Sequence, residues 1–263
     1  MNESAFDQIA RSARDLNIDL PAAEMAALAQ EENMCEQSIN DINAVFSYLE
    51  KKHNDAVVEQ CIRLSRLPRK EPKTFDNFDF SRIHGKDAEA LKNISTLAPL
   101  YARKNMAFIG PQGIGKTHIA MAFGRAVCEQ RMKAYFLKAT ELNQKLTNAR
   151  KLDRVAAVTN GLVRPSCLII DEVGRCVFDE ANTQIFFDII DRRSNKEGPG
   201  CMIFTSNKNP STWGKYFVEQ DSLLCALDRF FDDSMVFMIK GESYRGRKTE
   251  TISLEAGTSK SIK

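Results

Sequence analysis

One segment, Gly110–Thr117, constrains the fold of this chain of 263 residues more than any other feature. Its letters, GPQGIGKT, match the pattern G-x-x-x-x-G-K-[ST] in full. In this pattern the glycines let backbone N–H groups turn inward around a phosphate without side-chain clashes, and the helix that follows adds the positive end of its dipole. An apolar run precedes the segment and a helical pattern follows it. The sequence therefore predicts a strand, a phosphate-binding loop and a helix.

The loop predicts that the chain binds ATP together with Mg²⁺. Lys116 is expected to place its charge on the β and γ phosphates, and the hydroxyl of Thr117 is expected to ligate Mg²⁺. The other predicted contacts to the nucleotide are the rest of the loop and the residue after it: Gly110, Pro111, Gln112, Gly113, Ile114, Gly115 and His118.

A second apolar run, Cys167–Ile170, ends in two acidic residues, Asp171 and Glu172. In open α/β sheets the C-terminal ends of the strands face the ligand. We expect this strand to neighbour the strand of the phosphate loop, with Asp171 holding Mg²⁺ and Glu172 orienting and deprotonating the attacking water. Two acids at the end of a strand also occur by chance as surface residues, and it is their combination with the phosphate-binding loop that favours a magnesium site.

A third run, Cys201–Thr205, is followed by Ser206 and Asn207. A polar strand end between the phosphate loop and the acidic strand can position water and sense the γ-phosphate, and Asn207 is the candidate. The alternative is a polar residue that caps the strand exit.

Short apolar runs alternate with helical patterns throughout residues 82–248. The predicted strands are Met106–Ile109, Ala134–Leu137, Cys167–Ile170, Cys201–Thr205 and Met235–Ile239. The predicted helices are Asp87–Ala102, Thr117–Gln130, Glu141–Ala149, Glu180–Arg193 and Ser222–Phe230. This alternation predicts parallel βαβ units in a three-layer α/β domain.

Residues 1–66 show helical patterns and no strand, which predicts a small all-α N-terminal domain. Pro21 favours a helix start before Ala22–Gln30, and Ser38 with Asp41 resembles a capping box for the next helix. Residues 67–81 contain two prolines and are expected to form a linker whose aromatic residues pack onto the next domain. The polar residues 249–263 are expected to be a disordered tail.

Charge is unevenly distributed along the chain, although the net charge is only +2. Residues 1–50 hold ten acids and two bases, a balance of −8, whereas residues 51–104 hold twelve bases and seven acids, a balance of +5. This asymmetry is compatible with a basic surface for nucleic acid and an acidic surface for a protein, or with solvated helix faces.

The cysteines and the apolar runs indicate in which cellular compartment the protein is expected. Its seven cysteines are spread out and include no C-x-x-C pair, which predicts reduced thiols in a cytoplasmic protein. No apolar run reaches membrane-spanning length, the first residues lack a secretory signal, and three distant histidines argue against a zinc site.

Five segments, GPQGIGKTHIAMAFG, LIIDEVG, FTSNKNPSTWG, LLCALDRFFD and KGESYRG, occur in this order. Together they resemble the IstB-like branch of the AAA+ ATPases, which includes the helper ATPases of two-gene insertion sequences and is related to DnaC-type helicase loaders. The resemblance covers about residues 65–248, and residues 1–64 do not follow the pattern. Arg175 and Cys176 stand where this branch commonly has a tyrosine and a leucine.

The resemblance implies a P-loop NTPase fold of the AAA+/ASCE type, with a small helical lid after the last strand. It implies that Asn207 is a sensor, that Arg229 is an arginine finger acting on the ATP of a neighbouring subunit, and that Arg245 is a second sensor. Without the resemblance, Arg229 is a cation near a helix C-terminus and Arg245 a solvated arginine. Arg192 and Arg193 are alternative fingers.

The resemblance also implies a homo-oligomeric ATP hydrolase that binds duplex DNA largely independently of sequence. It would help a transposase by selecting or remodelling target DNA. Candidate DNA contacts, which equally fit solvated surface residues, are Lys145, Arg150, Lys151, Arg154, Lys208 and Lys215. The alternatives are a loader that binds a replicative helicase, a nucleotide-gated adaptor that hydrolyses ATP slowly, and a small-molecule kinase. Glu172 directly after Asp171 favours water as the acceptor over a metabolite.

Overall fold

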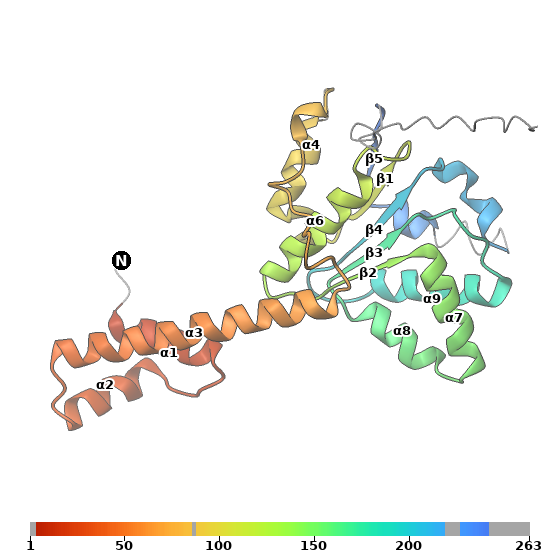
Figure 1. Cartoon of the computed structure of the whole chain (residues 1–263). Helices are drawn as coiled ribbons and strands as arrows, with labels where there is room; N and C mark the ends of the chain where they lie inside the picture. The colour runs from red at the N-terminus through yellow and green to blue at the C-terminus, as the bar shows by residue number, and fades with distance from the viewer. Residues whose placement is uncertain (1–3, 86–87, 219–226, 242–263) are drawn as a thin grey trace, which may run out of the picture.

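An N-terminal arm of three helices extends from an α/β body (Figure 1). The computed structural model describes residues 4–85, 88–218 and 227–241. The arm consists of α1 (Ala5–Asp15), α2 (Ala22–Glu31) and α3 (Glu36–Leu64). The C-terminal part of α3 contacts α6 and β2 of the body. Asp15, the last residue of α1, also reaches the body and forms an ion pair with Arg131 at 3.1 Å. The predicted all-helical character of this part of the chain is confirmed.

The long helix α3 differs from the prediction in where it begins and how far it runs. No glycine or proline interrupts residues 36–64, and the two expected helical patterns merge into one helix of 29 residues. The predicted capping box of Ser38 and Asp41 is wrong, because the helix begins at Glu36 and Ser38 lies inside its first turn. A capping box is present instead at α1, between Ser4 and Asp7.

The body is built on a five-stranded parallel sheet with the order β2-β3-β4-β1-β5. Its strands are β1 (Asn105–Ile109), β2 (Ala134–Lys138), β3 (Cys167–Asp171), β4 (Cys201–Ser206) and β5 (Ser234–Met238). All five predicted strands are confirmed to within one residue at each end. We expected the acidic strand β3 to be the direct neighbour of β1. This expectation is wrong, because β4 lies between the two strands.

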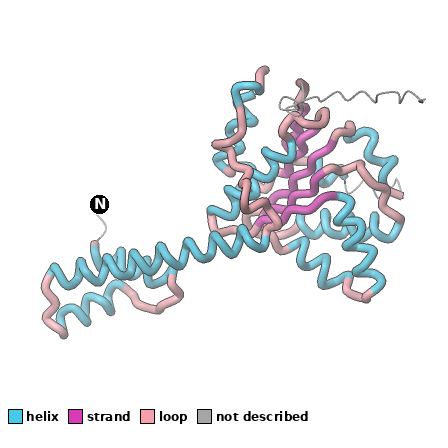
Figure 2. Tube along the Cα trace, viewed as in Figure 1, coloured by secondary structure: helices cyan, strands magenta, loops and turns pink. Residues whose placement is uncertain are grey.

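Helices cover both faces of the sheet, as Figure 2 shows, so the predicted three-layer architecture is confirmed. Side chains alternate along the strands: Ala107 and Ile109 point into one core, and Met106 and Phe108 point into the other. The first core is closed by α7 (Ala139–Lys151), α8 (Val155–Val163) and α9 (Glu180–Ser194). The second is closed by α6 (Lys116–Glu129), by residues around α4 and α5, and by the end of α3.

The predicted helix Asp87–Ala102 is wrong as a single element. The structure has α4 (Ala88–Asn93), the 3-10 turn η2 (Ile94–Thr96) and α5 (Ala98–Tyr101). Leu97 adopts a left-handed φ of 60°, which breaks the helix, and Pro99 then lies in the first turn of α5, where its missing N–H costs no hydrogen bond. Two further 3-10 segments are η1 (Phe80–Arg82) and η3 (Pro210–Tyr216).

Some expectations fall on residues that the structure does not describe. The predicted helix Ser222–Phe230 lies outside them up to residue 226, and residues 227–231 are helical. The predicted tail, residues 249–263, and Arg245 also lie outside. Within the described part of the chain, no helix has the length and apolar character needed to cross a membrane. The cysteines of that part are free thiols, and burial raises the pKa of Cys128 to about 11.

Candidate nucleotide-binding site

The phosphate-binding loop lies between the end of β1 and the start of α6, as predicted. Its backbone conformation requires glycine at two positions. Gly110 has a φ of 153°, and a Cβ atom there would lie 2.1 Å from the carbonyl oxygen of Ile239. Gly115 has a φ of 93°, and its Cβ would lie 2.6 Å from the ring of Phe78. Side chains at these positions would both strain the loop and collide with its supports.

Lys116 begins α6, and its ammonium group is directed back over the loop. Its Nζ donates hydrogen bonds to the carbonyl oxygens of Gly110 (2.8 Å) and Pro111 (2.6 Å) and to Oδ1 of Asn207 (2.7 Å). The residue is only 6% exposed. The structure therefore brings together the two predicted residues from different strand ends, and it places a buried positive charge at the loop.

Asp171, the last residue of β3, faces the first turn of α6. Its Oδ1 accepts hydrogen bonds from Oγ1 of Thr117 (2.6 Å) and from Oγ1 of Thr205 (2.5 Å), and the residue is 3% exposed. Carboxylate and hydroxyl oxygens are the ligands that Mg²⁺ prefers, and Mg²⁺ in phosphate sites takes few protein ligands and completes its shell with water and phosphate oxygens. The pair of Thr117 and Asp171 fits such an ion. The described residues contain no group of three or more acidic, histidine or cysteine side chains that could hold a metal without such additional ligands.

Glu172 follows Asp171 in a left-handed conformation with a φ of 61°, and its backbone N–H donates to Oγ1 of Thr205 at 3.1 Å. Two cations hold its carboxylate. Nη1 of Arg175 donates to Oε1 at 2.6 Å, and Nζ of Lys138, at the end of β2, lies 3.8 Å from Oε2. Glu172 is thus close to Asp171, as predicted, but its carboxylate must leave these cations before it can act on a water molecule.

Three further residues belong to this site and were not predicted from the sequence: Thr205, Lys138 and Arg175. Thr205 lies in β4, which separates β1 from β3, so it can reach both acidic residues. Lys138 pairs in register with Asp171. All three lie near the C-terminal ends of predicted strands, which could have indicated them. Choosing them required the order of the strands in the sheet, which the sequence does not give.

His118 follows Thr117 in α6. Its ring contacts the segment 67–81 rather than the phosphate-binding loop. Nε2 lies 2.9 Å from the carbonyl oxygen of Thr74, and the ring packs edge-on against Phe78 at 5.3 Å. Burial lowers the pKa of His118. Phe78 is buried and Phe75 and Phe80 pack partly against the same core, so the aromatic residues of this segment pack on the body as expected.

Arg229 lies far from the loop of its own chain. It lines a cavity of about 280 Å³ together with Asn105, Cys201 and Met202, which mark the beginnings of β1 and β4. The nucleotide loop follows the opposite end of β1. The guanidinium of Arg229 forms an ion pair with Asp191, and its side chain is 58% exposed.

The alternative finger Arg193 is buried beneath the start of β4. It is 8% exposed and donates hydrogen bonds to the carbonyl oxygens of Leu162, Val163, Pro165, Ser166 and Cys201. The other alternative, Arg192, donates to Oδ1 of Asn160 at 2.6 Å.

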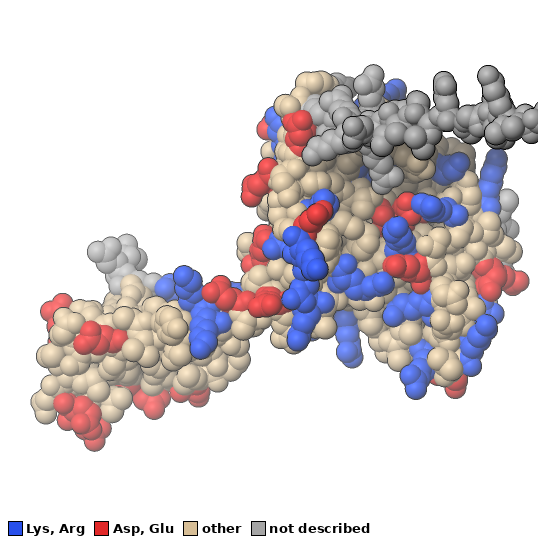
Figure 3. Space-filling view, viewed as in Figure 1, with Lys and Arg blue, Asp and Glu red and all other residues tan. Residues whose placement is uncertain are grey.

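Figure 3 shows lysine and arginine side chains spread over the face of the body that it presents, with acidic side chains between them. Arg150 is held by Asp179 at 2.8 Å and is part of a local network. Lys145 and Arg154 line a hollow of about 600 Å³ with Arg66, next to the exposed Leu152. The remaining candidates are exposed: Lys151, Lys208 and Lys215.

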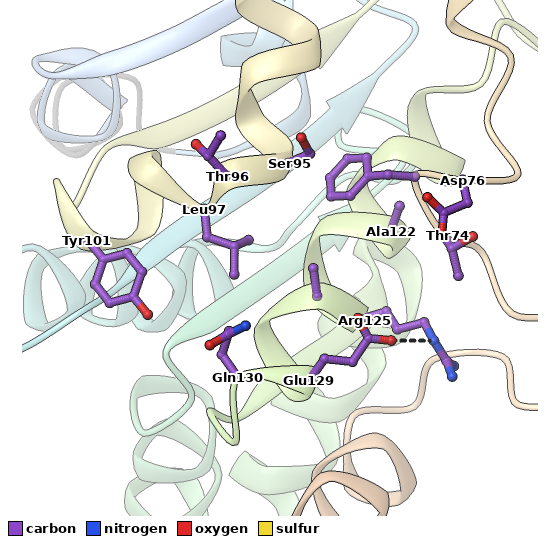
Figure 4. Close-up of a pocket in the computed structure, with 12 residues that line it drawn as sticks. Thr74, Asp76, Ser95, Thr96, Leu97, Tyr101, Ala122, Arg125, Glu129 and Gln130 are labelled. Carbon is purple, nitrogen blue, oxygen red and sulfur yellow. Dashed lines mark hydrogen bonds and ion pairs between the residues drawn. The ribbon is translucent and has the colours of Figure 1, made fainter. Parts of the chain in front are cut away.

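A separate cavity of about 490 Å³ lies on the outer side of α6, between residues 74–76 and the turn of η2 and α5 (Figure 4). Arg125 and Glu129 of α6 form an ion pair at 3.1 Å at its wall. No residue of the phosphate-binding loop lines it. The cavity is therefore distinct from the candidate nucleotide site.

Comparisons with known proteins agree with this geometry. The family model described as IstB-like ATP binding protein matches residues 12–252. The chain is 35% identical over 191 residues to the ATP-binding protein of insertion sequence IS5376 of Geobacillus stearothermophilus, a match that covers 73% of this chain and 74% of the relative. It is 31% identical over 188 residues to the ATP-binding protein of insertion sequence IS21 of Pseudomonas aeruginosa, covering 72% and 69%.

Among solved structures, AMPPCP-bound DnaA from Aquifex aeolicus is similar, with a TM-score of 0.54 at 22% identity. The match covers 67% of this chain and 51%, about half, of the DnaA chain, and it shows a shared fold.

The family match corrects one expectation. It begins at residue 12 and so includes most of the N-terminal arm, which the sequence motifs alone placed outside the resemblance.

Proposed function

Since the chain belongs to the family of IstB-like ATP binding proteins, we propose that it hydrolyses ATP as a homo-oligomer on duplex DNA and assists a transposase. One observation supports the hydrolytic part above all others. Lys116, Asp171 and Asn207 come from three separate elements and meet at one edge of the sheet, where hydrogen bonds connect them to the loop and to α6. This is the edge at which parallel α/β sheets bind their ligands.

In the proposed reaction, Lys116 leaves its carbonyl partners and binds the β and γ phosphates of ATP. Thr117 and Asp171 would hold Mg²⁺, which would supply positive charge beside the phosphate oxygens. Glu172, once released from Arg175 and Lys138, accepts a proton from water. The water oxygen bonds to the γ-phosphorus, and the bond to the ADP oxygen breaks.

The proposal that Arg229 acts on a neighbouring subunit is supported by its position. Arg229 lies near the beginnings of β1 and β4, far from the loop at the end of β1. Its side chain is exposed, so a neighbouring subunit can approach it. A guanidinium offers charge stabilisation to the γ-phosphate in the transition state. Its pair with Asp191 would have to open when subunits assemble.

We expect Arg229→Ala to keep ATP binding and to lose at least about a hundredfold in the rate of hydrolysis. Mixing this variant with Lys116→Ala protein is expected to restore part of the activity, because one mixed interface then combines an intact loop with an intact arginine. The measurement is phosphate release across a series of mixing ratios. If every mixture released phosphate no faster than the sum of its two inactive components, Arg229 would not act across subunits.

DNA binding is supported by Lys145 and Arg154, which line the hollow beside α7 and α8, and by the insertion-sequence context of the relatives. We expect Lys145→Ala with Arg154→Ala to weaken binding to duplex DNA similarly for all sequences, and to reduce the slope of log affinity against log salt by about 2. Fluorescence anisotropy at several salt concentrations, with ATP and Mg²⁺, measures both quantities. Lys92→Ala with Lys104→Ala, which removes two cations elsewhere on the body, is the matched control. An unchanged slope in the first double variant contradicts the assignment of this surface.

The proposed transposase partner rests on the relatives, which are ATP-binding proteins of insertion sequences. A pull-down with the transposase and with a replicative helicase separates this function from helicase loading. Capture of the helicase alone would replace the transposition role and would leave the ATPase site unaffected.

A further inference from the structure

A second arginine, Arg103, lies close to the proposed finger Arg229. Both residues line the cavity of about 280 Å³ at the beginnings of β1 and β4. They come from distant parts of the chain, because Arg103 precedes β1 whereas Arg229 lies in the helical residues 227–231 before β5. The fold therefore brings two cations together at the edge of the sheet that is opposite to the phosphate-binding loop.

The last turn of α9 holds both guanidinium groups. Nη2 of Arg103 donates to the carbonyl oxygen of Ser194 at 2.7 Å, and the guanidinium of Arg229 forms an ion pair with Asp191. Residues three apart on a helix are surface neighbours, with about 5–6 Å between their Cβ atoms. The two arginines are thus held next to each other at the C-terminal end of α9, where the negative end of the helix dipole favours cations.

Positive charge exceeds negative charge around this cavity. Three arginines and two aspartates line it, and one of these aspartates, Asp233, is paired with Lys104 at 3.0 Å. Within the described part of the chain, Arg103 forms no ion pair with a carboxylate. Burial and the charges of Arg193 and Arg103 lower the pKa of the neighbouring Lys196, which reflects the same excess. An anion that entered the cavity would compensate this charge.

We infer that Arg103 acts together with Arg229 on the ATP of the neighbouring subunit, an inference that rests on the proposed role of Arg229 across subunits. The γ-phosphate of that ATP would lie between the two guanidinium groups. In the transition state of hydrolysis, charge spreads over three equatorial oxygens of the phosphoryl group, so a second guanidinium has an oxygen to bind. Arg103 gives up only a neutral carbonyl partner to reach it, whereas Arg229 gives up a carboxylate.

The position of Arg103 excludes the ATP of its own subunit as its target. Arg103 precedes β1, and the phosphate-binding loop follows the other end of this strand. β1 has five residues, which separate its two ends by roughly 16 Å. Arg103 is exposed, so a neighbouring subunit can approach it as it can approach Arg229.

Arg103→Ala protein is expected to hydrolyse ATP at least about tenfold more slowly than the parent and to bind ATP equally well. Arg103→Lys keeps the charge but loses the planar fork that matches phosphate oxygens, so an intermediate rate is expected. Arg164→Ala is the matched control, because this exposed arginine precedes β3 at the same edge of the sheet and does not line the cavity. Phosphate release and calorimetric titration measure hydrolysis and binding, and circular dichroism checks that each variant is folded.

Mixtures of variants show on which subunit Arg103 acts. Arg103→Ala with Lys116→Ala is expected to regain part of the activity, because one mixed interface combines an intact loop with both arginines. Arg103→Ala with Arg229→Ala is expected to stay inactive, because every interface then lacks one of the two arginines. If Arg103 served its own subunit, this second mixture would regain activity instead, and that result would overturn the inference.

The mixture of Arg229→Ala with Lys116→Ala, measured alongside, separates this inference from the proposed function. Activity regained in that mixture, but not in the mixture of Arg103→Ala with Lys116→Ala, would reject the role of Arg103 and leave the finger in place. No regained activity in either mixture would reject the shared interface and both roles with it. Hydrolysis by Arg103→Ala at the parent's rate would also overturn the inference.

Discussion

Glu172→Gln protein is expected to bind ATP as tightly as the parent and to release phosphate at least about a hundredfold more slowly. Glutamine keeps the size of the side chain and one carbonyl oxygen, but it cannot accept a proton from water. The backbone of Glu172 is held by Thr205, so the substitution leaves the loop and the magnesium ligands in place. Calorimetric titration with ATP and an assay of phosphate release measure the two quantities separately.

Glu180→Gln is the matched control for this substitution. Glu180 is an exposed acid in the first turn of α9, outside the site, and its replacement is expected to leave both quantities unchanged. Equal hydrolysis by Glu172→Gln and the parent would remove Glu172 from the proposed role. A variant that loses hydrolysis and also loses ATP binding would assign the residue to binding rather than to proton transfer.

Lys116→Ala protein is expected to lose at least about a hundredfold in affinity for ATP. The substitution removes a charge that is only 6% exposed and leaves the carbonyl oxygens of Gly110 and Pro111 without their donor in the absence of nucleotide. Binding of a fluorescent ATP analogue measures the effect, and thermal unfolding verifies that the variant is folded.

Lys133→Ala, at an exposed position before β2, is the control for Lys116→Ala and is expected to bind ATP like the parent. An affinity of Lys116→Ala within about threefold of the parent would mean that the triphosphate binds elsewhere on the molecule.

The strands and the phosphate loop were predictable from the sequence for a physical reason. Parallel strands covered on both faces are short, continuous apolar runs, and the loop requires glycines at positions where a side chain would collide. Helix ends were less predictable. The break at Leu97 depends on a left-handed residue that local patterns do not indicate, whereas Pro99 did offer a signal against a continuous helix.

The helix α8, Val155–Val163, was not predicted, because it lacks a capping side chain and contains Gly161. Its apolar residues Val155, Val158 and Leu162 recur at helical spacing, and packing against α7 and α9 stabilises it. Tertiary contacts thus override a weak local preference.

The candidate site was predictable where a single segment carries it and not where segments meet. Asp171 and Glu172 are adjacent in the sequence, and their placement at the end of β3 follows from the apolar run before them. The bonds from Thr205 to Asp171 and from Arg175 to Glu172 depend on strand order and on loop conformation, which neither residue spacing nor composition specifies. The separation of Arg229 from the loop of its own chain was not predictable either. It depends on how the segments before and after β1 are arranged around that strand.

The most direct test of the nucleotide site is an experimental structure of the protein with AMPPCP and Mg²⁺. We expect the ammonium of Lys116 to have left the carbonyl oxygens of Gly110 and Pro111 for the β and γ phosphates, with Mg²⁺ bound between Thr117 and Asp171. A nucleotide seated away from this loop, or a Lys116 side chain that keeps its present partners while the phosphates bind elsewhere, would contradict the proposed site.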